Sequence, residues 1–142
     1  MTTQVFPSLS DFEGLWHIDR RIADTQAGQT GHFEGTATFS SAADGVAYHE
    51  VGLLHMPHHA PFHAERRYHW REVGRQLQIF FDDGRFFHGF SPTEPKATHW
   101  CDPDTYDVSY VFDDWPNWQS TWTVNGPRKA YQMVSHYSRL KT

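Results

Sequence analysis

Apolar and polar residues alternate along much of the chain, with the period of two that is typical of a half-buried β-strand. In the segment 32–41, Phe33 and Phe39 share one face with small residues, and the polar residues between them share the other. The segment 118–124 alternates in the same way. Helical spacing of apolar residues is confined to residues 8–12, where we expect one short helical turn. The pattern therefore predicts an all-β protein.

Turn residues interrupt the chain at intervals of about ten residues, which is typical of an antiparallel meander. Asp82-Asp83-Gly84 and Asn125-Gly126 are strong hairpin signals, because glycine readily adopts the positive φ that such turns require. Between the turns we expect about ten strands, at residues 14–24, 32–41, 46–56, 62–72, 76–81, 85–90, 97–101, 105–112, 118–124 and 129–140.

We expect these sequential strands to close into a single up-and-down antiparallel barrel, because closure leaves no unpaired sheet edge. A two-sheet sandwich is the alternative. The chain of 142 residues is long enough for one domain with a real core, so we treat residues 1–142 as one barrel domain. A barrel of about this size can hold one small ligand.

Charge and composition argue against several classes of protein. With 12 Lys and Arg against 17 Asp and Glu, the net charge of -5 disfavours a nucleic-acid partner held by phosphate contacts. A mean hydropathy of -0.68 and the lack of a long apolar run disfavour a membrane protein. The single cysteine excludes an internal disulfide, and the sequence begins without a secretory leader, so we expect a cytoplasmic protein of bacterial type.

A Gly-x-Trp motif, Gly14-Leu15-Trp16, stands at the head of the first expected strand. It resembles the motif of the calycin barrels, which include lipocalins, fatty-acid-binding proteins and nitrobindin-like heme barrels. In those barrels the tryptophan plugs the base, and an arginine of the closing strand lies over it. The resemblance implies that Trp16 is a structural plug and that Arg139, in the last expected strand, covers it.

Three longer segments resemble a bacterial domain-of-unknown-function family, number 6314, whose members have about this length. The segments are FFDDGRFFH at 80–88, HWCDPDTY at 99–106 and GPRKAY at 126–131. The resemblance spans most of the chain and implies a calycin-like barrel. It implies no activity, so the expected function rests on the residues themselves.

Alternation also predicts which side chains face the barrel interior. If Trp16 points inward, Arg20 does so too, and the same parity places Glu50 and Arg66 inside. A buried arginine is costly unless it is paired or meets an anion. We therefore expect an internal ion pair that leaves one guanidinium for a carboxylate or phosphate of a ligand. The alternative is that an arginine faces solvent, through a shift of one residue in register.

These considerations favour a barrel that binds a small acidic or aromatic organic molecule as its partner. The alternative is a lyase, isomerase or hydrolase that uses His99, Glu50 or Tyr68 as acid or base. A third class is a structural or partner-binding barrel filled by its own side chains. The ligand-binding residues that we predict are Arg20, Tyr48, Glu50, Arg66, Tyr68, Trp70, Phe87, His99, Tyr106, Trp122 and Tyr131.

Other reactive side chains allow further interpretations. His99 and Cys101 share one face of an expected strand and could form an activated thiol, but a lone cysteine is more often a small buried residue. Four histidines surround the turn after the third expected strand and could bind zinc or nickel loosely. We expect solvated turn histidines and no metal there; the four are His55, His58, His59 and His63.

The likeness to nitrobindin-like barrels implies heme as a minor alternative. No histidine of this chain can be aligned with the axial position, so we expect no cofactor. Trp115 and Trp118 flank Pro116 and could form a lid, a contact in a homodimer or, for Trp118, part of the core.

Overall fold

The computed structural model describes residues 7–140 and is all-β, as the alternation predicts. A short 3-10 helix, η1 (Leu9–Phe12), precedes the strands. Two predicted strands have the observed bounds, and the others differ by a few residues at their ends. The strands are β1 (Gly14–Asp24), β2 (Gln29–Ala42), β3 (Gly45–His55), β4 (Phe62–Val73), β5 (Gln76–Phe81), β6 (Phe86–Phe90), β7 (Lys96–Cys101), β8 (Asp104–Asp114), β9 (Asn117–Asn125) and β10 (Ala130–Arg139).

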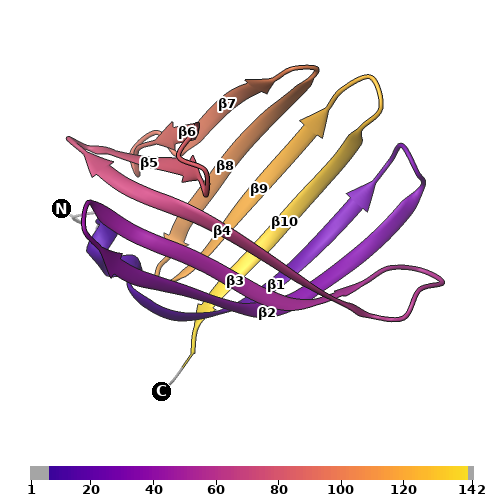
Figure 1. Cartoon of the computed structure of the whole chain (residues 1–142), viewed down its shortest axis with the longest axis horizontal. Coiled ribbons are helices and arrows are strands. Elements are labelled where there is room, and N and C mark those ends of the chain that lie inside the picture. The colour runs from indigo at the N-terminus through magenta and orange to yellow at the C-terminus, as the bar shows by residue number, and fades with distance from the viewer. Residues whose placement is uncertain (1–6, 141–142) are drawn as a thin grey trace.

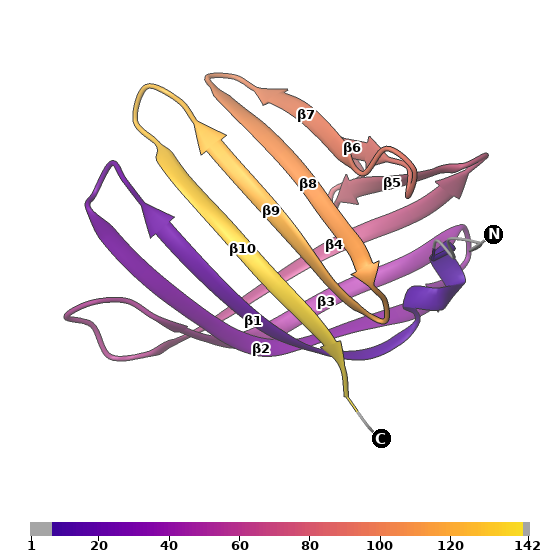
Figure 2. The same ribbon diagram turned by 180° about the vertical axis from the view of Figure 1, so that it is seen from behind.

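All these strands belong to one antiparallel sheet, in the order β6-β5-β4-β3-β2-β1-β10-β9-β8-β7. The sheet curls until β6 and β7, which end this order, approach each other, and the result is a nearly closed barrel (Figures 1 and 2). Within residues 7–140 no ladder of hydrogen bonds joins β6 to β7, and an isolated bridge links Ser91 to Glu94 in the turn between them. The up-and-down barrel is confirmed, and the two-sheet sandwich is wrong.

One end of the barrel is closed by η1 and a layer of aromatic rings. Trp16 is completely buried, and its indole N–H donates a hydrogen bond to the carbonyl oxygen of Phe12, at 2.8 Å. The guanidinium carbon of Arg139 lies 4.0 Å from the centre of the Trp16 ring. A side chain at Gly14 would collide with this guanidinium, since a Cβ there would lie 2.7 Å from Nη1 of Arg139. The first strand therefore begins with glycine because arginine covers the plug.

The tryptophans near the β8–β9 turn belong to this closed end. Trp118 is buried and stacks on Tyr137, with ring centres 3.8 Å apart. Trp115 is half-buried and packs edge-on against Phe12, with ring centres 5.0 Å apart. Both rings pack against the core, so the expectation of a lid is wrong. The reason is that η1 supplies an aromatic partner, Phe12, which the strand pattern alone does not place.

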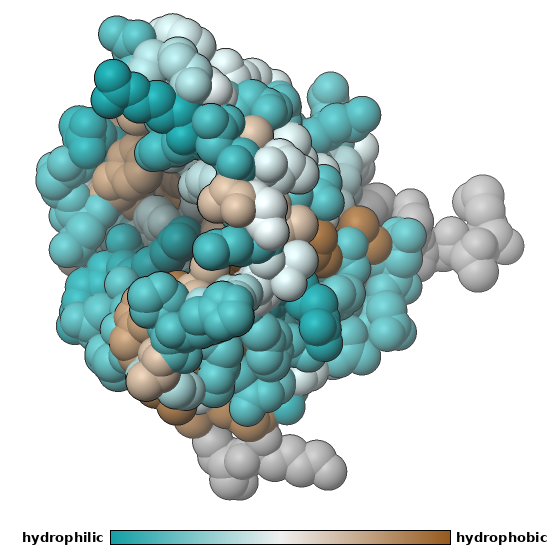
Figure 3. Space-filling model, turned by 90° about the vertical axis from the view of Figure 1, so that its right-hand side faces the viewer, coloured by the Kyte–Doolittle hydropathy of each residue, from teal (hydrophilic) through white to brown (hydrophobic). Residues whose placement is uncertain are grey.

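The opposite end of the barrel is bordered by the tips of hairpins, which lie on the right in Figure 1. These hairpins join β1 to β2, β3 to β4, β7 to β8 and β9 to β10. Figure 3 looks onto this end, where polar and apolar side chains surround a hollow. The interior is therefore approached from the end opposite to η1.

One irregularity changes which side chains point inward. Between β5 and β6 the register shifts, so that Phe80 pairs with Phe86 while Ile79 pairs with His88. Phe87 is the extra residue of this β-bulge, and both Phe87 and His88 are buried. Strict alternation would bury only one of two consecutive side chains. His88 faces inward in the same register as Phe90, and the bulge adds Phe87 to the barrel interior beside it.

We expect Trp16→Ala to lower the free energy of unfolding by about 3–5 kcal/mol, the typical cost of removing a large buried ring. Urea denaturation followed by circular dichroism measures the change. Trp100→Ala is the matched control, because Trp100 is 62% exposed and its removal should cost less than about 0.5 kcal/mol. A loss below about 1 kcal/mol for Trp16→Ala would contradict its role as a plug.

Candidate functional site

A small cavity lies in the middle of the barrel, next to the aromatic layer of the closed end. Its free volume is about 30 Å³, roughly the space of two water molecules. The predicted ligand-binding residues that border it are Arg20, Tyr48, Glu50, Arg66, Tyr68, Trp70, Phe87 and Trp122. The sequence did not lead us to predict the other residues that border the cavity, namely Ile79, His88, Tyr110, Trp118, Ser120 and Tyr137. Parity along their strands already pointed Tyr110, Ser120 and Tyr137 inward, so this signal could have found them. His88 was missed because alternation from Phe87, which we predicted inward, turns the neighbouring residue outward.

An ion pair occupies the centre of the barrel beside this cavity. The guanidinium of Arg20 donates two hydrogen bonds to the carboxylate of Glu50, at 2.6 and 3.0 Å, and a third to the hydroxyl of Ser135, at 2.7 Å. The Tyr48 hydroxyl donates a further bond to Glu50, at 2.5 Å, and lies 3.0 Å from the Tyr137 hydroxyl. Arg20 is 5% exposed and Glu50 is 2% exposed. Charges this deep are tolerated because nearly every donor and acceptor is used.

Glu50 remains ionised inside the barrel. Burial by itself would raise the pKa of its carboxyl group, but the hydrogen bonds and positive charge of Arg20 outweigh burial and hold the pKa below its usual value. A carboxylate held in this way is a weak proton acceptor at neutral pH. The pairing therefore favours Glu50 as an anchor for Arg20 over Glu50 as the acid or base of an enzyme.

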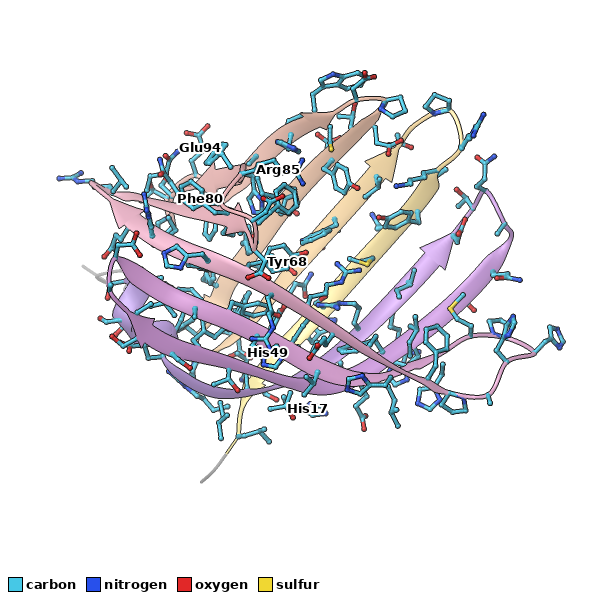
Figure 4. The ribbon with its side chains drawn as sticks, in the orientation of Figure 1. His17, His49, Tyr68, Phe80, Arg85 and Glu94 are labelled. Atoms are coloured by element: carbon cyan, nitrogen blue, oxygen red, sulfur yellow. The ribbon has the colours of Figure 1, made fainter. Side chains whose placement is uncertain are left out.

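Arg66 is the internal arginine that this pair leaves over. It is half-buried on β4, and its guanidinium carbon lies 5.5 Å from the centre of the Trp122 ring. In the part of the chain that the structure describes, no carboxylate oxygen lies within 4.0 Å of its nitrogens. Arg66 and Tyr68, which points into the barrel in Figure 4, border both the central cavity and a wider hollow at the barrel surface. A positive charge thus lies where the two spaces meet.

The wider hollow is open to solvent and has a volume of about 430 Å³. Two of its rings, Tyr68 and Phe81, have centres 6.3 Å apart and offer apolar contact. Its acidic rim is partly neutralised, because Asp83 accepts a hydrogen bond from Arg85 at 2.7 Å. An apolar group resting on the two rings would lie beside Arg66. The residues that line the hollow are Arg66, Arg67, Tyr68, Phe81, Asp82 and Asp83.

His88 on β6 lies opposite Ile79 and faces the barrel interior. It is 2% exposed, and its Nε2 lies 2.7 Å from the hydroxyl of Tyr110 on β8. Its Nδ1 has no hydrogen-bond partner among residues 7–140. Burial, with a smaller contribution from the charge of His99, lowers the pKa of His88 to about 3. The ring is therefore neutral at pH 7 and has one free nitrogen.

The remaining predicted ligand residues, His99, Tyr106 and Tyr131, do not border the central cavity. They are half-buried and lie near the hairpin tips. His99 packs edge-on against Phe87, with ring centres 5.3 Å apart, and Tyr106 does so at 5.7 Å. Burial raises the pKa of Tyr131 to about 12. These side chains therefore line the approach from the open end.

The structure contradicts the expected burial of Cys101, whose thiol is exposed. Cys101 is the last residue of β7, next to the turn into β8, and this position lies beyond the packed interior. His99, two residues earlier, packs against Phe87. The two side chains therefore have different surroundings, and the geometry does not favour an activated thiol.

The histidines around the β3–β4 loop are solvent-exposed: His55, His58, His59 and His63. Over the described range 7–140, no group of three or more His, Cys, Asp or Glu side chains is arranged to hold a metal ion. Heme does not fit the interior, because the free space beside His88 is about 30 Å³ and the Nε2 of this ring is engaged by Tyr110.

A nearly closed up-and-down barrel of this kind, with a plugged base and a polar interior, is a calycin-like barrel. The chain belongs to a family of unknown function, DUF6314, whose model matches residues 12–139. The resemblance seen in the sequence motifs is thereby confirmed.

Among solved structures, the barrel resembles an S-type phycobiliprotein lyase from Guillardia theta, with a TM-score of 0.66 and 9% sequence identity. The match covers 94% of this chain and 91% of that chain. At this identity the likeness shows a shared fold alone. No curated protein matches the sequence. Helices long and apolar enough to cross a membrane are absent from the described residues.

We expect Arg20→Met to lower the free energy of unfolding by about 3–5 kcal/mol, because it leaves the buried Glu50 carboxylate without a cation. The double variant Arg20→Met/Glu50→Leu removes both charges and should recover most of the loss. Arg66→Met is the matched control and should change stability by less than about 1 kcal/mol, since Arg66 holds no carboxylate. Urea titrations measure all three variants. Equal losses of stability for Arg20→Met and Arg66→Met would contradict the conclusion that Arg20, and not Arg66, is the partner of Glu50.

We expect acid to weaken the folded state through His88. Because the pKa of His88 falls from 6.5 to about 3 on folding, the unfolded chain takes up this proton first as the pH drops below 6.5. The contribution of His88 to stability is complete above that pH and declines by about 1.4 kcal/mol per pH unit toward pH 3. Urea titrations between pH 7 and pH 4.5 should give a flatter profile for His88→Phe/Tyr110→Phe than for wild type. Parallel profiles would show that His88 is not desolvated.

Proposed function

We propose that this barrel binds a small organic acid with an aromatic body, and that Arg66 holds the acid group. The observation that carries the proposal is the unequal state of the two internal arginines. Arg20 is bound by Glu50, whereas Arg66 has no carboxylate partner in the described chain. A partly desolvated guanidinium is a strong site for a carboxylate, because two of its N–H groups can donate in parallel.

The two spaces beside Arg66 define the shape of the proposed ligand. The central cavity of about 30 Å³ has room for a carboxylate but not for a ring. The open hollow of about 430 Å³ offers the rings of Tyr68 and Phe81, on which an aromatic body can stack. The ligand that fits directs its acid group inward and its ring toward solvent.

The other predicted residues have supporting roles in this proposal. Trp122 supports the Arg66 guanidinium with the face of its ring. Tyr48 donates a hydrogen bond to Glu50 and so helps to hold the carboxylate that binds Arg20. His99 and Tyr106, half-buried at the open end, line the route by which the acid enters.

We expect phenylacetate to bind the wild-type protein, and Arg66→Met to weaken this binding at least tenfold, a difference of about 1.4 kcal/mol. Isothermal titration calorimetry, with quenching of tryptophan fluorescence as a second readout, measures Kd. Arg21→Met is the matched control, because Arg21 is exposed on the outer face of β1. Equal affinities for wild type and Arg66→Met would overturn the proposal.

A further inference from the structure

Two polar groups beside the central cavity have no partner. The Nδ1 of His88 and the indole N–H of Trp118 are both buried and lack a hydrogen bond within residues 7–140. Both residues border the same cavity as Arg66. An unpaired buried polar atom destabilises the state that leaves it without a partner. The cavity therefore favours an occupant with a hydrogen-bonding group over an apolar one.

The kind of group that suits His88 follows from its other nitrogen. A neutral imidazole has one donor and one acceptor, and Nε2 is already bonded to the hydroxyl of Tyr110. If Nε2 donates to that hydroxyl, Nδ1 accepts, and if the hydroxyl donates to Nε2, Nδ1 donates. A ligand hydroxyl satisfies Nδ1 in either case, because it can both donate and accept. A ketone or carboxylate, which only accepts, satisfies it in one case alone.

We infer that His88 is a specificity-determining residue that recognises a hydroxyl group next to the carboxylate of the ligand. The ligand class is then an aromatic 2-hydroxy acid. This inference rests on the proposed function, which places the carboxylate on Arg66. The cavity has room for about two water-sized groups. Adjacent carbon atoms are the most compact way to carry a carboxylate for Arg66 and a hydroxyl for His88.

Mandelate and phenylacetate are the probes, because they share a ring and a carboxylate and differ in the 2-hydroxyl group. We expect wild type to bind one enantiomer of mandelate at least tenfold more tightly than phenylacetate, since the hydroxyl pairs an otherwise unpaired buried nitrogen. His88→Phe should abolish this preference, so that this variant binds mandelate and phenylacetate with equal Kd. Calorimetric titration of each acid into each variant measures both values.

Tyr110→Phe is the matched control. It removes the hydroxyl beside His88 but keeps the imidazole, so the preference for mandelate should persist. The double variant His88→Phe/Tyr110→Phe removes both partners of the buried hydrogen bond and leaves neither unpaired. It provides the same test if His88→Phe alone does not fold, and it should lack the preference.

The possible outcomes separate this inference from the proposed function. If wild type binds both acids equally and Arg66→Met weakens both, the hydroxyl inference is overturned and the proposed function stands. If the preference for mandelate survives in the double variant, another group recognises the hydroxyl and the inference is overturned. If neither acid binds wild type, the proposed function and the inference fail together.

Discussion

The buried ion pair between Arg20 and Glu50 is the interaction on which the arrangement of the interior depends. The two charges come from β1 and β3, which lie on either side of β2, and Ser135 of β10 completes the hydrogen bonding. A shift of one residue in any of these strands would turn a member of the set outward and leave a buried charge alone. The pair therefore selects one register for this half of the barrel. It also commits one arginine, and by doing so leaves Arg66 available.

The interior changes character from one end to the other. The base is apolar and closed, with Trp16 under Arg139. It stabilises the fold mainly by burying apolar surface rather than by polar contacts. In the middle, the fully buried side-chain nitrogens and oxygens of residues 7–140 are hydrogen-bonded except at His88 and Trp118. The open end has half-buried rings. A well-packed base lets the middle carry charged groups that would otherwise weaken a small barrel, and the incompletely packed end is where a ligand can enter.

Short-range patterns in the sequence explain which features of the fold and of the site could be predicted. Alternation and turn residues act over a few positions, so they predicted the strands, the barrel, and the inward direction of Arg20, Glu50 and Arg66. Which arginine pairs with Glu50 depends on distances across β2, and these do not follow from local pattern. His88 was missed because a bulge breaks parity, and nothing in the run of residues 86–88 marks the extra residue. The prediction that Cys101 is buried was wrong, because the end of a strand can lie outside the packed interior.

The sheet is a split cylinder rather than a closed ring, because no ladder joins β6 to β7 in the described chain. A fully closed barrel can increase its diameter only by breaking backbone hydrogen bonds. A barrel that is open between two strands can widen when its sheet bends. The strands at the split carry Phe87 and His88 on one side and His99 on the other. Widening there would separate the rings of Phe87 and His99 and stretch the hydrogen bond that joins His88 on β6 to Tyr110 on β8. Side chains that meet across the split, rather than a backbone ladder between β6 and β7, therefore hold the barrel closed there.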